Sequence, residues 1–315
     1  MRPQILVVSH GPHCLDGVTA AAAVARYFGD RADVTARFAS NSEIDRTLRS
    51  LDPPSPAETQ LWVTDISWRE PETDAHLRAL AAKGVRIFWI DHHRTALERV
   101  RDGRVNVPFT DTVLSEEFAA SRLVYEYLQR RLAAEGKTDR SFATFAPVVA
   151  MADDNDRWLH RVAGSRELGW VVRELGPDAY PDFLGLDERV EYTPRMALAR
   201  DRVGAEIARS FEVAEQSRVE RRIGGVTLVA AICDGHPSEI GDAWGKKISR
   251  AVFALYDAKS LSVSFRRSPD CDVDLSKVAQ ALGGGGHAAA SGAAQPDLRR
   301  VFASLVADAV ENVLK

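Results

Sequence analysis

The sequence has few cysteines, no excess of positive charge and no long apolar run. Its three cysteines, Cys14, Cys233 and Cys271, stand far apart in 315 residues and form no CxxC pair. An odd number of distant cysteines argues against a disulfide framework, and the lack of a CxxC pair argues against a structural zinc site. Such cysteine usage suits a reducing compartment, so we expect a cytoplasmic protein. The apolar stretch at residues 5–8 is too short for a secretory core or a membrane span, so we expect no membrane partner.

The charge and length of the chain limit its partners and its organisation. The formal net charge is -4 at pH 7, so the chain has no general attraction for nucleic acid and long duplex DNA is not an expected partner. Any anionic substrate must be held locally, by metal ions or a small basic pocket. A chain of 315 residues is too long for one small core, so we expect two domains.

The first hundred residues alternate between short apolar runs and helix-favouring segments. The runs lie at residues 5–8, 61–64 and 86–90, and helical patterns lie at residues 17–28 and 71–83. This βαβ rhythm predicts an α/β fold with a mainly parallel sheet that is covered by helices.

The middle of the chain is predicted to be helical. One helix should begin after Ser115, its expected N-cap, and end at Gly136. A second is expected over residues 141–152, and residues 159–194, rich in glycine and proline, should be irregular with short helices.

A long charged helical pattern at residues 195–222 predicts a helical connector between two domains. Residues 1–194 would form the first domain and residues 223–315 a smaller α/β domain. Within the second we expect three strands and two helices, at residues 226–232, 251–255, 261–265, 274–282 and from Asp297 onward.

Each of the three early strands ends in side chains of metal-ligand type. These are His10, His13, Cys14 and Asp16 after the first strand, Asp65 after the second, and Asp91, His92 and His93 after the third. Because ligands gather at the carboxyl ends of strands in open α/β sheets, we expect these residues to converge. A mixed histidine and carboxylate set favours manganese or a similar ion over calcium, and a two-metal site predicts hydrolysis of phosphate esters.

Two further segments are candidates for the site. The aspartates Asp153, Asp154 and Asp156 could be solvated surface, but the following Trp158 and their place after the third strand make one of them a candidate metal ligand. The segment from Gly283 to His287 brings backbone N–H groups close to an anion, although a flexible turn is the alternative. Arg266 and Arg267, at the end of a strand, could supply positive charge.

With these residues in hand, the sequence resembles the DHH/DHHA1 phosphoesterase superfamily, which includes oligoribonucleases, bisphosphonucleotide phosphatases and dinucleotide phosphodiesterases. The resemblance spans nearly the whole chain and depends on an ordered set of motifs. They are Ser9-His10, Asp16-Gly17, Asp65, Asp91-His92-His93, Asp156-Arg157-Trp158, Val263-Ser264-Phe265-Arg266, residues 274–279 and residues 283–287.

The resemblance implies a role for each matched residue. His10 and Cys14 would bind one metal ion, Asp16, His92 and an aspartate of the acidic cluster a second, and Asp65 would bridge both. Asp65, Asp91, His92 and His93 would form the catalytic group, with His93 on the scissile phosphate. The substrate would be held by residues of the smaller domain, namely Arg266, Gly284, Gly285, Gly286 and His287.

The sequence departs from the family pattern at Cys14, where most members have aspartate, as in a subgroup whose motif reads Cys-x-Asp-Gly. Two divalent ions are expected, with manganese as the first expectation and zinc, iron or magnesium as alternatives. A thiolate is a softer ligand than a carboxylate, so Cys14 could shift the metal preference toward zinc or iron, or His13 could replace the thiol. The sequence also leaves open which aspartate of the acidic cluster binds metal. The position of Trp158 favours Asp156, with Asp153 or Asp154 as alternatives.

The sequence therefore predicts a metal-dependent phosphoesterase that hydrolyses short single-stranded oligonucleotides or dinucleotides. A bisphosphonucleotide phosphatase, an exopolyphosphatase or pyrophosphatase, and a nucleotide-binding regulator without turnover are the alternatives. A homodimer is one possible assembly.

Overall fold

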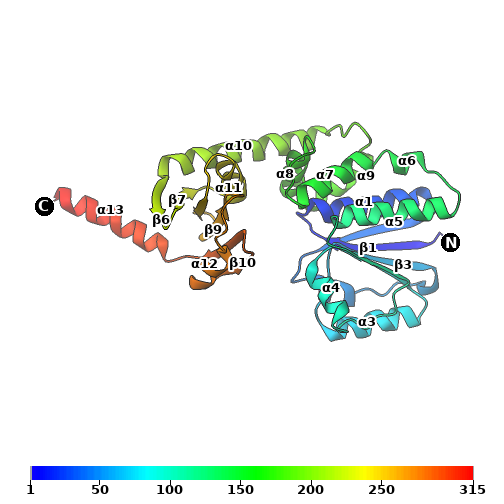
Figure 1. Cartoon of the computed structure of the whole chain (residues 1–315). Coiled ribbons are helices and arrows are strands. Elements are labelled where there is room, and N and C mark those ends of the chain that lie inside the picture. Colours follow the sequence, from blue (N-terminus) through cyan, green and yellow to red (C-terminus); the bar gives the residue numbers. More distant parts are fainter. Residues whose placement is uncertain (1, 315) are drawn as a thin grey trace. The chain divides into compact units, whose positions relative to one another are not determined.

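The computed structural model describes residues 2–314, which form two compact units. The first extends to Val203 and the second begins at Gly204, so the division falls inside helix α10 (Pro194–Ser217; Figure 1). The predicted α/β class is confirmed in both units. No helix in the described part of the chain is long and apolar enough to cross a membrane. The assignment of a catalytic and a substrate-binding domain stays a prediction.

The first unit is built on a five-stranded sheet in the order β2-β1-β3-β4-β5, in which all neighbours are parallel. The middle strand β3 is buried at every position, as a strand between two layers of helices must be. The strands are β1 (Gln4–His10), β2 (Asp33–Ala39), β3 (Thr59–Thr64), β4 (Arg86–Asp91) and β5 (Asp111–Leu114).

Helices cover both faces of this sheet. Along β3, Trp62 packs into one apolar core and its neighbours Leu61 and Val63 into the other, because successive side chains point to opposite faces. One face carries α1 (Leu15–Phe28), α5 (Ala120–Ala134), α6 (Arg140–Ala143), α7 (Ala146–Asp156), α8 (Ser165–Leu175) and α9 (Ala179–Gly185), and the other carries α2 (Ile44–Arg49), α3 (Pro71–Ala82) and α4 (Arg94–Arg101; Figure 1).

The structure differs from the sequence prediction in the middle of the chain. Ser115 is not a helix N-cap: it follows strand β5, and its N–H donates to the Asp91 carbonyl at 3.2 Å. Helix α5 begins only at Ala120, where the side chain of Asp16 accepts from the backbone N–H groups. The helix predicted over residues 141–152 is two helices, α6 and α7, and α7 continues through Asp156.

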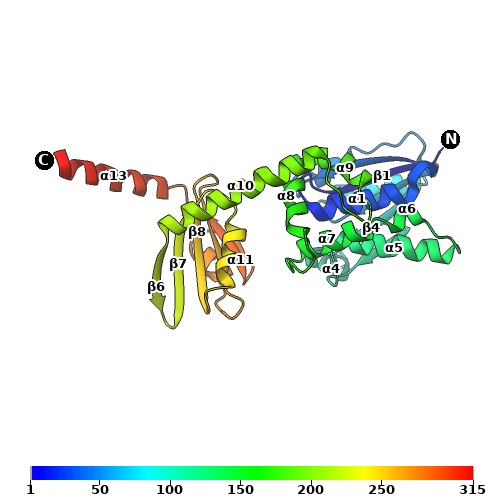
Figure 2. The ribbon, with the colours of Figure 1, turned by 90° about the horizontal axis from the view of Figure 1, so that it is seen from above.

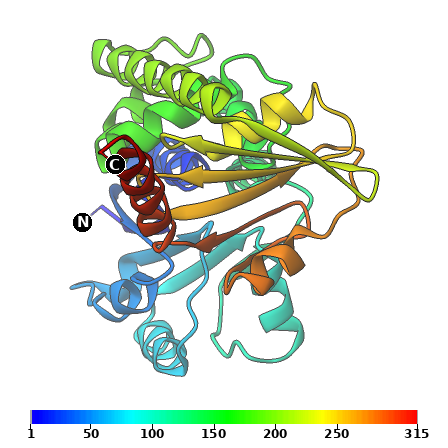
Figure 3. The ribbon, with the colours of Figure 1, turned by 90° about the vertical axis from the view of Figure 1, so that its left-hand side faces the viewer.

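The second unit contains a six-stranded sheet in the order β10-β11-β9-β8-β7-β6, in which only β7 and β8 are parallel. Figure 2 shows β6, β7 and β8 side by side, and Figure 3 shows the terminal helix α13 ending at the C-terminus. The elements are β6 (Val219–Ile223), β7 (Val226–Cys233), α11 (Pro237–Gly245), β8 (Ala251–Asp257), β9 (Ser262–Arg267), α12 (Leu275–Ala281), β10 (Gly285–Gly286), β11 (Ala290–Ala294) and α13 (Leu298–Leu314).

The connector predicted over residues 195–222 is only partly helical. Helix α10 ends at Ser217, and the charged residues that follow form strand β6. Gly224 and Gly225, with φ of 55° and 82°, make the turn into β7. Left-handed backbone of this kind favours glycine, so the two glycines close a hairpin and do not end a helix.

Candidate active site

Three neighbouring strands bring the central residues of the site together. His10 is the last residue of β1, Asp65 directly follows β3, and His92 directly follows β4. Because β1, β3 and β4 are parallel neighbours, their carboxyl ends meet at one edge of the sheet. The Asp65 carboxylate lies 3.6 Å from His10 Nδ1 and 3.3 Å from His92 Nε2.

Asp65 occupies the centre of this arrangement. Its backbone is left-handed, with φ of 59°, and its N–H donates to the Ile90 carbonyl at 3.0 Å. Such a conformation is uncommon for a residue other than glycine and tends to occur at functional positions. Burial alone would raise the pKa of Asp65, but the adjacent imidazoles of His10 and His92 outweigh it and hold that pKa well below its ordinary value.

The side chains at this edge form three overlapping groups of metal-ligand type, each with its ligand atoms within 4.8 Å of one another. Asp65 belongs to two of the groups, and His92 belongs to two. They are His10 with Cys14 and Asp65, Asp65 with His92 and His93, and Asp16 with His92 and Asp156.

Two buried atoms at the shared positions show that these donors fit a divalent cation. Asp65 Oδ1 and His92 Nε2 make no hydrogen bond, although each is shielded from solvent. A buried polar atom without a partner costs free energy, and a bound cation would satisfy both of these. The mixture of carboxylates, imidazoles and one thiol matches first-row transition metals better than calcium.

The structure distinguishes between the three candidate aspartates, which all lie in the last turns of α7. Asp156 faces the site, with Oδ2 at 3.6 Å from His92 Nε2. Asp153 accepts instead from the N–H of Ala119 at 2.8 Å, and Asp154 accepts from the hydroxyl of Ser165 at 2.5 Å. Geometry therefore favours Asp156 as the ligand from this helix.

His13 and Cys14 both follow β1, but only Cys14 reaches the cluster. Its Sγ donates to Asp65 Oδ2 at 3.3 Å. Burial, with the nearby charges of Asp65 and Asp16, raises the pKa of this thiol well above its ordinary value, so it is protonated in the absence of a cation. His13 is exposed, its Nδ1 lies 2.8 Å from the Arg173 carbonyl, and it belongs to none of the three groups. Geometry therefore favours Cys14 over His13 as the ligand from this segment.

Asp91 belongs to none of the three groups, but it contacts two of their members. Its Oδ1 accepts from His93 Nδ1 at 2.7 Å and from the backbone N–H of His92 at 2.8 Å. The hydrogen bond to Asp91 raises the pKa of His93. Asp91 thus fixes the orientation of His93, which keeps its second ring nitrogen for a ligand.

The carboxylate of Asp16 is held from the far side by the start of helix α5. Its two oxygens accept from the N–H of Ala120 at 2.8 Å and of Ser121 at 2.9 Å. A helix N-terminus attracts negative charge and leaves free N–H groups, so α5 orients this candidate ligand. This contact could not be predicted from the sequence, because backbone donors leave no signal in the choice of residues.

In the second unit, the predicted substrate residues lie in strands β9 and β10 and in the residues next to β10. Gly285 and Gly286 form β10, which pairs antiparallel with β11. His287 follows and is exposed. Arg266, in β9, donates from Nη2 to the Ser238 hydroxyl at 2.7 Å, and burial lowers its pKa. Arg267 donates to the Val273 carbonyl at 2.9 Å and so supports its own domain.

Two adjacent glycines of this loop should respond very differently to alanine. A Cβ on Gly284 would lie 2.1 Å from the Gly292 carbonyl oxygen, whereas a Cβ on Gly285 would meet nothing within 4 Å. We expect Gly284→Ala to destabilise the second unit by roughly 1–3 kcal/mol, because backbone must move to relieve the overlap. Gly285→Ala is the matched control, and thermal unfolding measures both. Equal melting temperatures for the two variants would contradict this packing.

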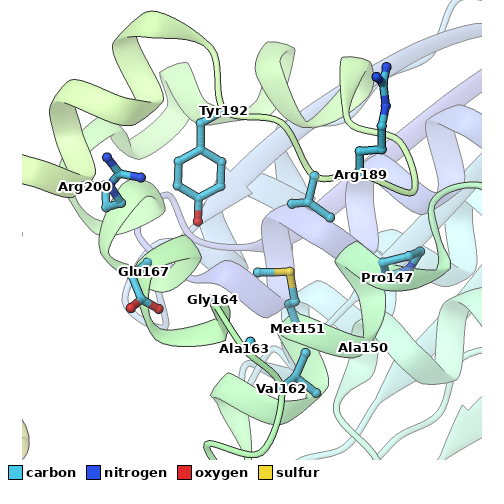
Figure 4. A pocket seen from close by; sticks show the side chains of 11 residues that line it. Pro147, Ala150, Met151, Val162, Ala163, Gly164, Glu167, Arg189, Tyr192 and Arg200 are labelled. Carbon is cyan, nitrogen blue, oxygen red and sulfur yellow. The ribbon is translucent and has the colours of Figure 1, made fainter.

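The first unit also contains a cavity of about 690 Å³ away from these groups (Figure 4). Its walls come from α7, α8, α10 and the segments between them, and include Met151, Glu167, Tyr192 and Arg200. The Arg200 guanidinium lies over the Tyr192 ring, 5.7 Å from its centre. None of the predicted site residues lines this cavity, so its size does not make it the reaction centre.

Comparison with known proteins agrees with this geometry. No family model matches the sequence. The chain is 25% identical over 306 residues to the oligoribonuclease NrnB of Bacillus subtilis, a match that covers 94% of this chain and 74% of that protein. Its fold is similar to that of the pGpG-specific phosphodiesterase PggH of Vibrio cholerae, with a TM-score of 0.56, 12% identity and 98% of each chain covered.

Fold and site together describe an α/β protein with a cluster of carboxylates, imidazoles and one thiol at the carboxyl edge of its first sheet. Both matches agree with the resemblance to the DHH/DHHA1 phosphoesterase superfamily.

Proposed function

We propose that the protein hydrolyses phosphodiester bonds in short single-stranded oligonucleotides or dinucleotides. The protein is a hydrolase that acts on phosphoric ester bonds, which agrees with the sequence prediction. The observation that carries the proposal is the position of Asp65, whose carboxylate lies against His10, Cys14 and His92 at once. The similarity to an oligoribonuclease along 94% of the chain supports the substrate class.

The site would hold two divalent ions, with manganese as the first expectation and zinc, iron or magnesium as alternatives. His10, Cys14 and Asp65 would hold one, and Asp16, His92 and Asp156 the other, with Asp65 between them. When bound, such ions acidify a water molecule for attack and neutralise charge on the phosphoryl group.

The residues of the chain would then position the substrate. His93, oriented by Asp91, would donate a hydrogen bond to a phosphoryl oxygen, since its raised pKa favours the protonated form. Asp16, held by two N–H groups of α5, would keep its ligand oxygens fixed. Arg266, Gly284, Gly285, Gly286 and His287 would bind the remainder of a short anionic chain.

A substrate panel tests the proposal. The purified protein is assayed with manganese, zinc, iron and magnesium against RNA of two to five nucleotides, a linear dinucleotide, a bisphosphonucleotide and polyphosphate. We expect the short RNA and the dinucleotide to give the highest kcat/KM. Phosphate release from the bisphosphonucleotide alone would assign a phosphatase, and turnover of polyphosphate alone would assign an exopolyphosphatase.

A nucleotide-binding regulator is the alternative that Cys14 suggests, because most members of the family have aspartate there. Turnover by the wild-type protein would exclude this alternative. An inactive wild-type protein that gains activity on Cys14→Asp would establish it.

Metal binding should release protons, so affinity should rise with pH. Burial opposes charge on His92, but the nearby carboxylates of Asp65, Asp16 and Asp156 raise its pKa to about 9. A group with a raised pKa keeps its proton at neutral pH, and that proton competes with a cation until the pH passes the pKa. We expect manganese affinity to increase by up to about tenfold per pH unit for each proton displaced.

Calorimetry in two buffers of different ionisation enthalpy measures this proton release directly. The variant His92→Gln cannot hold the competing proton and should show a weaker dependence of the remaining affinity on pH. An affinity for the wild-type protein that is constant between neutral and mildly alkaline pH would contradict the expectation.

A further inference from the structure

The chain adopts a strained conformation directly after Asp156. Trp158 and His160 have positive φ angles of 55° and 53°. Bulky side chains rarely adopt the left-handed region, and where they do the strain often serves a functional site. Backbone hydrogen bonds hold the turn, from Trp158 N–H to the Asn155 carbonyl at 3.0 Å and from Leu159 N–H to the Asp154 carbonyl at 2.9 Å.

This turn leaves the indole of Trp158 at the surface. The residue is 41% exposed, whereas Trp62, Trp68, Trp89 and Trp244 are at most 2% exposed. An indole buries a large apolar area when it serves the core, so a purely structural role would place it inside. The exposure of Trp158 leaves part of its indole open to a ligand.

Neighbouring side chains fix the orientation of the exposed ring. The His160 ring meets it edge-on, with ring centres 4.5 Å apart at 75°. The guanidinium of Arg166 lies 5.6 Å from the centre of the indole and also donates to His160 Nδ1 at 3.0 Å. A ring that is held in this way loses little conformational freedom when a planar ligand stacks on its open part.

The backbone of Trp158 is also close to the candidate reaction centre. Trp158 is two residues after Asp156, so their Cα atoms are at most about 7.6 Å apart. Asp156 in turn lies against His92. In a bound dinucleotide, the two bases flank the cleaved phosphate, so each lies within one nucleotide of that centre. Arginine next to an exposed aromatic ring is the combination by which proteins bind single-stranded nucleic acid without reading its sequence.

We propose that Trp158, held by His160 and Arg166, is the stacking platform for the nucleobase next to the scissile phosphate. This inference depends on the proposed function and extends it to the base. Stacking accepts any base, so the platform would make the enzyme tolerant of sequence while favouring nucleotides over polyphosphate. Trp158 would act on substrate affinity, since it supplies no ligand to a cation and no proton to the reaction.

Kinetics with matched variants test the platform. The substrates are a dinucleotide and two analogues, each lacking one of the two bases. We expect Trp158→Leu to raise KM for the dinucleotide on the order of tenfold with little change in kcat, while Trp158→Phe, which keeps an aromatic face, stays within about threefold. The effect of Trp158→Leu should vanish for the analogue that lacks the stacked base. An equal effect on all three substrates would show a structural role and overturn the proposal.

Fluorescence gives a second readout that does not require turnover. Wild-type protein and Trp158→Phe are titrated with the dinucleotide in the absence of metal. We expect quenching in the wild type that is lost in the variant. Identical fluorescence changes in both proteins would overturn the platform. Quenching confined to the wild type, in a protein that does not cleave the dinucleotide, would keep the platform and reject the proposed reaction.

Discussion

An Asp65→Asn variant is expected to lose phosphodiester hydrolysis by on the order of 1,000-fold or more. The amide has nearly the same shape, but it is neutral and offers only one acceptor oxygen. Asp65 belongs to two of the three ligand groups, so the change weakens both at once. Metal content by mass spectrometry of the purified protein, together with kcat, measures the loss.

The control for this variant is Asp74→Asn, the same change at a buried carboxylate of the same unit. Asp74 accepts from Trp68 Nε1 at 2.5 Å and from the Asn106 N–H at 3.1 Å, and it belongs to no ligand group. We expect this control to lower thermal stability and to retain metal content and rate well below its melting temperature. If Asp65→Asn kept its metal and a rate near that of the wild type, Asp65 would not be a bridging ligand.

Gly17→Ala should have the second largest effect, although glycine carries no reactive group. A Cβ at this position in the first turn of α1 would lie 2.1 Å from the carbonyl oxygen of His10 and 2.8 Å from its carbonyl carbon. Both are backbone atoms, so the end of β1 must move, and the His10 side chain moves with it. We expect activity to fall by about 100-fold, since displacement of a catalytic group by an ångström can cost that much.

Gly185→Ala provides the matched control for the glycine at position 17. Gly185 ends helix α9 in the same unit, and an added Cβ would meet nothing within 4 Å. Its rate and melting temperature should be close to those of the wild type. A Gly17→Ala protein with wild-type kcat/KM would mean that the position of His10 is not critical to the reaction.

The strands that carry the site could be predicted because they are buried. The continuous apolar runs in β1, β3 and β4 predict strands that lie inside a sheet. Four of the missed strands are at sheet edges: β2 largely alternates exposed and half-buried residues, β5 has four residues, β6 is exposed along its length and β10 has two residues. The fifth, β11, lies between β10 and β9 and contains only alanine, serine and glycine. An edge strand is held by one neighbour, and its sequence resembles that of a loop or a charged helix.

The site itself could be predicted only as far as side-chain chemistry allows. His10, Asp65 and His92 stood out because each follows a predicted strand. The choice of Asp156 over Asp153 and Asp154 needed the structure, since it depends on which carboxylates already accept hydrogen bonds elsewhere. The preference for Cys14 over His13 likewise depends on the contact between His13 and a distant carbonyl group.

The contact between Asp16 and helix α5 extends the active site into the main chain. Ala120 lies 104 residues beyond Asp16, and neither its methyl group nor its position in the sequence suggests any part in chemistry. Yet a substitution that frays the beginning of α5 would withdraw the donors that steady this carboxylate. Sequence changes around residues 119–121 would then alter the reaction without touching a single reactive side chain.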